Sequence, residues 1–123
     1  MCEGVAGLAW RDGWVAITDL PSFAPGSLRN MADLSTYPKE SPERQYAEAT
    51  NIRSAADLRT MEHYAEHFMG SVIERHDSSG KWGVLLLDSL EHQCPFPNSH
   101  TQTGKQFRKD FEYNAAILGR MLT

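Results

Sequence analysis

The chain has 123 residues and a formal net charge of −4, with 41% hydrophobic and 23% charged residues. This length suits one domain, and the composition excludes a wholly disordered chain and an extended coiled coil. Because the charge is modest and both signs are interspersed, it argues against capture of nucleic acid by a charged surface. We therefore expect one globular domain over residues 1–123, with no nucleic-acid partner.

The apolar runs of the sequence are short. The longest covers residues 84–87, whereas about 20 apolar residues are needed to cross a bilayer. Residues 1–7 lack the basic lead and apolar stretch of a secretory signal, and two cysteines, Cys2 and Cys94, do not make a disulfide framework. We expect a soluble protein with no membrane partner, and the cytoplasm as its location.

The first expected element is a β-hairpin. Two apolar, aromatic-rich stretches, 5–10 and 14–20, are separated by Arg11-Asp12-Gly13. Aromatic and branched residues suit a half-buried strand, and Asp-Gly supplies the positive φ of a tight turn. The pattern predicts two antiparallel strands.

Prolines divide residues 21–53 into short pieces. They are Pro21, Pro25, Pro38 and Pro42. Ser27 precedes apolar residues at helical spacing (Leu28, Met31 and Leu34), which predicts a brief helix. Ser41 followed by Pro42 is a second helix start.

A long helix is predicted over 54–76. Ser54 is a good N-cap, and Asp57 lies in the first turn, where the helix dipole favours a negative charge. Apolar residues then recur at helical spacing. They are Leu58, Met61, Ala65, Phe68 and Val72.

A strand near 82–88 and a helix over about 103–122 follow. The strand is apolar at consecutive positions, which predicts burial on both faces at the centre of a sheet. The helix carries an apolar stripe through Phe107, Phe111 and Ala115. The predicted fold class is α+β: a small, mainly antiparallel sheet, made of the N-terminal hairpin and the central strand, packed by helices 54–76 and 103–122.

Two histidines in the predicted first helix form a candidate metal site. The segment from His63 to His67 resembles the H-x-x-E-H motif of the inverted zinc proteases, in which both histidines bind zinc and the glutamate, here Glu66, acts as a base. A catalytic zinc needs a third protein ligand, and the sequence offers none at the family's spacing. The favoured interpretation is an exposed, solvated helix face, with metal binding through His63 and His67 as the alternative.

The segment 88–100 is the candidate catalytic loop, because it collects a thiol, imidazoles and carboxylates after the buried strand. As a nucleophile, Cys94 would need His92 or His100 to lower its pKa and Asp88 to orient the imidazole. Cys94 with His92 and His100 could instead hold a metal. The favoured interpretation is a rigid turn, with Cys94 as a small buried hydrophobic residue.

No segment carries a complete catalytic constellation. We therefore expect a non-catalytic interaction protein, such as a regulator, inhibitor, immunity factor or subunit, with another protein as its partner. The alternatives are a small hydrolase or transferase using the loop 88–100, and a metal-binding protein. Ser79-Gly80-Lys81 lacks the other glycine of a phosphate-binding loop, so no cofactor is expected. The sequence leaves open whether the chain is an enzyme and what its oligomeric state is.

Overall fold

The computed structural model describes residues 3–24, 33–61, 63–77 and 79–122. Its helices are α1 (Gly4–Asp12), η2 (Leu34–Thr36, a 3-10 helix), α2 (Pro42–Ala49), α3 (Ala55–Arg59) and α4 (Gln102–Leu122). Its strands are β1 (Trp14–Ile17), β2 (His67–Glu74) and β3 (Lys81–Ser89), which form one antiparallel sheet in the order β1-β2-β3. The predicted fold class, α+β with a small antiparallel sheet, is confirmed.

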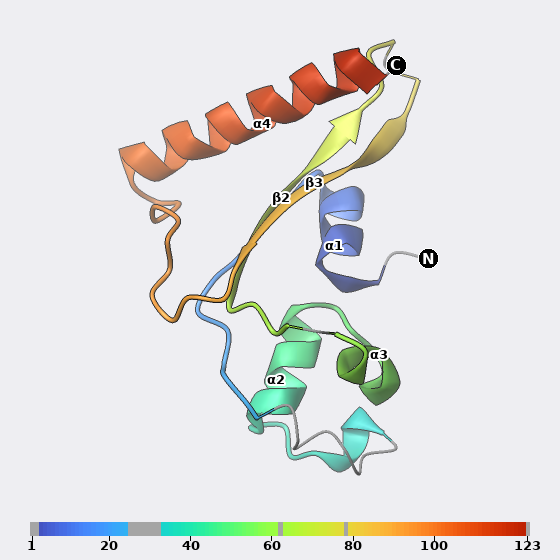
Figure 1. Cartoon of the computed structure of the whole chain (residues 1–123), viewed down its shortest axis with the longest axis vertical. Helices are drawn as coiled ribbons and strands as arrows, with labels where there is room; N and C mark the ends of the chain where they lie inside the picture. The colour runs from blue at the N-terminus through green and yellow to red at the C-terminus, as the bar shows by residue number, and fades with distance from the viewer. Residues whose placement is uncertain (1–2, 25–32, 62, 78, 123) are drawn as a thin grey trace.

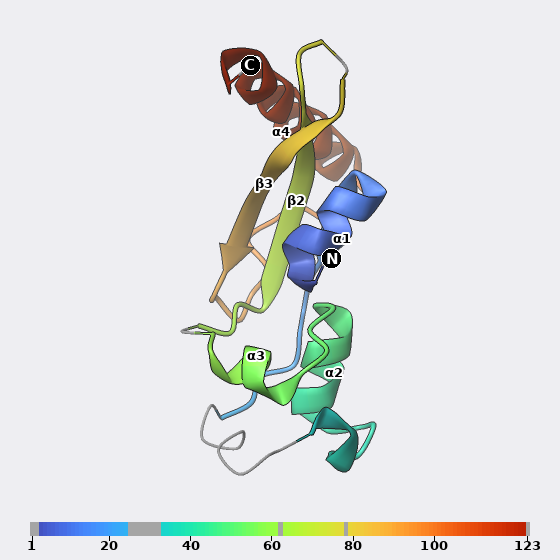
Figure 2. The same ribbon diagram turned by 90° about the vertical axis from the view of Figure 1, so that its right-hand side faces the viewer.

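The sheet separates α4 from the other helices. Helix α4 lies along one face of the sheet and α1 along the other, while α2 and α3 lie together beyond one end of the strands (Figure 1). Figure 2 shows β2 and β3 side by side, and the strand order leaves β3 at one edge of the sheet. Strand β2 is therefore the central strand of the sheet.

The first strand of the predicted hairpin is wrong, because residues 4–12 form helix α1. Val5 and Ala9, four residues apart, are both buried on one face of this helix. Gly13 does have the expected positive φ, 84°, but its N–H caps α1 by donating to the carbonyl of Ala9. The Asp-Gly signal marks a helix end here rather than a hairpin turn.

The predicted helix 54–76 is correct only at its beginning. The Ser54 hydroxyl caps α3 by accepting from the N–H of Asp57 at 3.1 Å, but α3 ends at Arg59 and residues 67–74 form β2. Gly70 would weaken a helix interior, and Val72 with Ile73 favours a strand. Because β2 is buried on both faces, its apolar residues do not alternate with polar ones. Such a run also contains apolar residues at helical spacing, which is why it matched a helix.

The predicted strand 82–88 exists as β3, but its expected central position is wrong. Strand β2 occupies the centre, and β3 pairs only along its β2 side in the described residues. Trp82, Leu86 and Leu87 are consequently exposed. The same apolar run that predicted a buried strand therefore lies at the margin of the sheet.

The helices predicted at 103–122 and after Ser41 are confirmed as α4 and α2. Helix α4 approaches β2 closely at Gly119, where an added Cβ would lie 2.2 Å from the carbonyl oxygen of Glu74. The helix predicted after Ser27 lies outside the described residues, except that Leu34 begins η2.

The main core lies on the α1 side of the sheet and continues to α2 and α3. It includes Val5, Ala9, Val15, Tyr46, Leu58 and Phe68. The Tyr46 ring is fully buried and forms edge contacts with Phe23 and Tyr64, at centroid distances of 5.4 and 5.9 Å. Its hydroxyl donates to the carbonyl of Ala65 at 2.6 Å, so the polar group of this core residue is satisfied.

Candidate functional site

The outer edge of β3 is the first candidate site. Antiparallel strands exchange hydrogen bonds at alternate residues. The N–H of Val72 donates to Gly13, next to β1, so the even-numbered β2 residues bond β1 and the odd-numbered ones bond β3. The register then directs Leu85 and Leu87 toward β2 and turns the N–H and C=O groups of Val84 and Leu86 outward.

Large apolar side chains accompany this row of backbone groups. Trp82 is 45% exposed, Leu86 36% and Leu87 44%, and Leu90 just after the strand is 56% exposed. The stretch from 82 to 87 contains no charged residue. Natural proteins usually protect such an edge with charges, proline or a covering element, because it otherwise pairs with other chains. We define Trp82, Val84, Leu86, Leu87 and the open backbone between them as the β3 edge.

The second candidate site is a pocket of about 300 Å³ between the start of the sheet and the loop after β3. Its lining comes from three parts of the chain that are distant in sequence: β1 and the residues that follow it, β2, and the loop 94–100. The lining residues are Ala16, Thr18, Asp19, Met69, Cys94, Phe96, Pro97, Asn98, Ser99 and His100. Cys94 and His100, both predicted from the sequence, therefore share one pocket.

The Cys94 thiol is engaged within its own turn. It is partly buried, and its Sγ donates to the carbonyl oxygen of Phe96 at 3.6 Å. This weak hydrogen bond directs the thiol toward the backbone of its own turn. The Phe96 ring lies 6.3 Å from the ring of Phe107 in α4, which holds the turn against the last helix.

The other two predicted catalytic residues lie outside this pocket. The His92 side chain is exposed, and its Nδ1 is 3.2 Å from a carboxylate oxygen of Glu66. Asp88 is exposed on β3 opposite Phe68, and its charge contributes, after burial, to the raised pKa of Tyr46. The loop thus brings Cys94 and His100 to one pocket but places His92 and Asp88 elsewhere.

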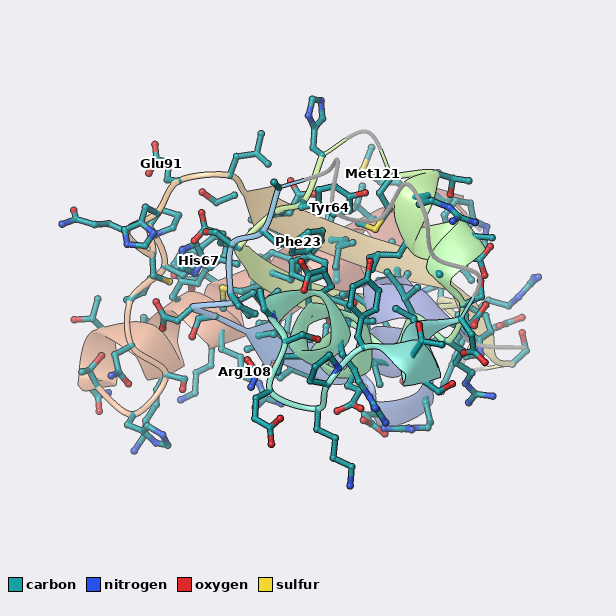
Figure 3. All side chains as sticks on the ribbon, turned by 90° about the horizontal axis from the view of Figure 1, so that it is seen from below. Phe23, Tyr64, His67, Glu91, Arg108 and Met121 are labelled. Carbon is teal, nitrogen blue, oxygen red and sulfur yellow. The ribbon has the colours of Figure 1, made fainter. Side chains whose placement is uncertain are left out.

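His67 is fully buried on β2 and both its ring nitrogens have partners. Nδ1 accepts from the N–H of Asp19 at 3.0 Å, and Nε2 lies 3.3 Å from the carbonyl oxygen of His92. Since Nδ1 is an acceptor, the ring proton sits on Nε2 and is donated to His92. Figure 3 shows His67 within the molecule and Glu91, on the loop that follows β3, pointing outward. His67 joins the segment after β1 to the loop after β3.

The predicted pairing of His63 with His67 on one helix face is wrong, because residues 63–66 are not helical and His67 begins β2. His63 is exposed in that segment, and His67 is on β2 with neither nitrogen open to a metal. Within the described part of the chain, no group of three or more histidine, cysteine, aspartate or glutamate side chains is placed to hold a metal ion.

Sequence reasoning missed the residues that β1 and the following turn bring to the pocket, Thr18 and Asp19. Asp19 has a positive φ of 60°, which aspartate tolerates better than most residues, but no local motif announces it. It also missed the β3 edge. The available signal was the pair of charges, Lys81 and Asp88, that bound the uncharged run on both sides, as gatekeeper residues do.

The comparisons with known proteins give no match to a family model, to a curated protein or to a solved structure. Among the described helices, none is long and apolar enough to span a membrane. The functional argument therefore depends on the two candidate sites themselves.

Proposed function

We propose that this chain is a non-catalytic interaction protein that binds another protein chain through the β3 edge. The supporting observation is the combination of backbone groups at Val84 and Leu86 that face away from β2, with no strand partner among the described residues, and the exposed side chains of Trp82 and Leu87. Strand addition uses both: the backbone gives affinity, and the alternating side chains give specificity. A regulator, an inhibitor, an immunity factor or a subunit would all use such a surface.

Site-specific photo-crosslinking tests this function. A photoreactive amino acid placed at Leu86 should give a discrete covalent adduct with a protein chain when the cells that produce it are irradiated. The same amino acid at Tyr113, a control position on α4 that is also exposed, should give none. The proposal fails if Leu86 gives no protein adduct, or if both positions give the same unspecific products.

A small hydrolase or transferase is the second candidate function, and the pocket shared by Cys94 and His100 is the observation that favours it. This alternative requires a reactive thiolate at neutral pH. Alkylation of the folded protein by iodoacetamide, compared with a Cys94→Ser variant, measures that reactivity directly. Because the thiol donates to Phe96, we expect slow labelling of Cys94 that accelerates on unfolding. Rapid labelling of the folded chain would favour the enzyme.

A further inference from the structure

We propose that the occupant of the β3 edge is a second copy of this chain, so that two β3 strands pair antiparallel about a two-fold axis and form one continuous sheet across the dimer. This inference rests on the proposed function, because it names the partner of the same surface. It follows from the backbone pattern of β3, from the charges at its two ends, and from the apolar side chains of Leu85 and Leu87 on the α4 face.

The backbone pattern of β3 permits symmetric pairing. A two-fold axis perpendicular to the sheet reverses the strand direction and keeps each face on the same side. With the axis at Leu85, the outward N–H and C=O groups of Val84 meet those of Leu86 of the second copy. By symmetry, those of Leu86 meet Val84 of the second copy. Both residues belong to the outward set, so each pair exchanges two hydrogen bonds.

The charges at the two ends of β3 favour an antiparallel arrangement. Lys81 lies on the α1 side, where its ammonium contacts the carbonyl and the ring of Trp10. Asp88, at the other end, is opposite Phe68, whose side chain belongs to the core on that same side. Antiparallel pairing brings Lys81 of each copy toward Asp88 of the other. Parallel pairing would bring like charges together, which is destabilising.

The opposite face of the sheet adds a second apolar layer. Arg108 and Glu112 of α4 line a pocket with residues 12–14, so their flank of the helix faces β1. From the helical period of 100° per residue, Leu118 lies on the other flank, toward β3. Leu85 and Leu87 share the α4 face with Ile73, which contacts Gly119. Because the two-fold axis keeps both α4 helices on one face, the Leu85 and Leu87 side chains of the two copies meet on that face, between the two helices.

Sedimentation equilibrium of the purified chain and its charge variants tests this dimer. The wild type should be a dimer at micromolar concentration. Lys81→Glu and Asp88→Lys should each raise the dissociation constant about tenfold, because each creates two like-charge contacts per dimer. The double variant, with the charges exchanged, should return to within about threefold of the wild type. Rescue of this kind requires that the two positions meet across the interface.

A second pair of variants addresses the centre of the interface. Leu86→Lys places two ammonium groups beside the axis and should give a monomer over the same concentrations. Tyr113→Lys adds the same charge on the exposed side of α4 and should remain dimeric. Circular dichroism confirms that both variants are folded.

The outcomes separate this inference from the proposed function. A wild-type chain that is monomeric at all concentrations overturns the dimer, while a photo-crosslink from Leu86 to a different protein would leave the interaction function standing. A dimer that tolerates Leu86→Lys, or charge reversals without rescue in the double variant, also overturns the β3 pairing.

Discussion

Strands β2 and β3 are neighbours in one sheet, and both carry large apolar side chains, but their surroundings are opposite. Strand β2 has a strand on each side, with α1 and α4 on its faces, and its residues from His67 to Ser71 are buried. Strand β3 has a partner on one side, and much of its length is exposed. Side chains of similar chemistry therefore stabilise the fold in β2 and remain available for binding in β3.

The polar groups show the same contrast. Among the described residues, every buried side-chain nitrogen or oxygen has a hydrogen-bond partner, and His67 of β2 uses both ring nitrogens. The outward backbone groups of β3 have no strand partner within the described chain. An added strand would pair with these groups directly.

The largest expected difference in stability comes from replacing one large apolar side chain by alanine in each of the two strands. Phe68→Ala in β2 should lower the free energy of unfolding by about 3–5 kcal/mol, because it removes a buried ring and leaves a cavity. Leu86→Ala in β3 should cost about 1 kcal/mol in dilute solution, because the side chain is already partly exposed. Urea denaturation of both variants measures the difference. Equal losses would mean that β3 is as buried as β2.

A second comparison separates the two histidines once grouped as a metal pair. His67→Ala should cost about 2–4 kcal/mol, because it leaves the N–H of Asp19 and the carbonyl of His92 without their buried partner. His63→Ala, at an exposed position, should change stability by less than about 0.5 kcal/mol. Thermal unfolding with and without added zinc checks both. A stabilisation by zinc that both substitutions abolish would contradict this assignment.

The smallest effect concerns Tyr46 at alkaline pH. Burial, aided by the charges of Asp88 and Glu66, raises the pKa of Tyr46 above the value of about 10 expected for an unfolded chain. A raised folded-state pKa contributes stability that is fully present below about pH 10 and is lost as the pH rises further, because only the unfolded chain then releases the proton.

Tyr46→Phe measures this contribution. It removes the hydrogen bond to Ala65 and should cost about 1 kcal/mol near neutral pH. Above about pH 10, the variant should lose less stability per pH unit than the wild type. Thermal unfolding midpoints of both chains across this range provide the test, and parallel losses would show that the Tyr46 phenol is not protected by the fold.

Local signals predicted the beginnings of α2 and α3, and the whole of α4, well. Ser41 and Ser54 both cap helices with their hydroxyls, and the amphipathic stripe of α4 extends over enough turns to exclude a strand. Gly13 was correctly placed at a positive φ but assigned to the wrong element, since the same backbone conformation ends helices and closes hairpins. Residues 67–74 were predicted as part of a helix. They form strand β2, and its burial on both faces removes the alternation of apolar and polar residues that identifies a strand.

In the candidate sites too, residues that are close in sequence could be predicted, and residues that only the tertiary structure brings together could not. Cys94 and His100 are close in sequence, so the loop that unites them could be predicted, whereas Thr18 and Asp19 reach the pocket only through the pairing of β1 with β2. The apolar run 82–87 does not by itself predict the exposure of β3. An apolar run of this length fits a central strand or an edge strand that another chain covers, and only the tertiary arrangement distinguishes them.

Amide hydrogen exchange of β3, resolved residue by residue by NMR, tests the central claim most directly. In dilute protein, the amides of Leu85 and Leu87 should exchange slowly, because they bond β2, while those of Val84 and Leu86 should exchange fast. Raising the protein concentration, or adding a partner identified by crosslinking, should slow Val84 and Leu86 selectively. If these two amides are already slow in the most dilute protein, or never slow under any condition, the β3 edge is not a binding surface.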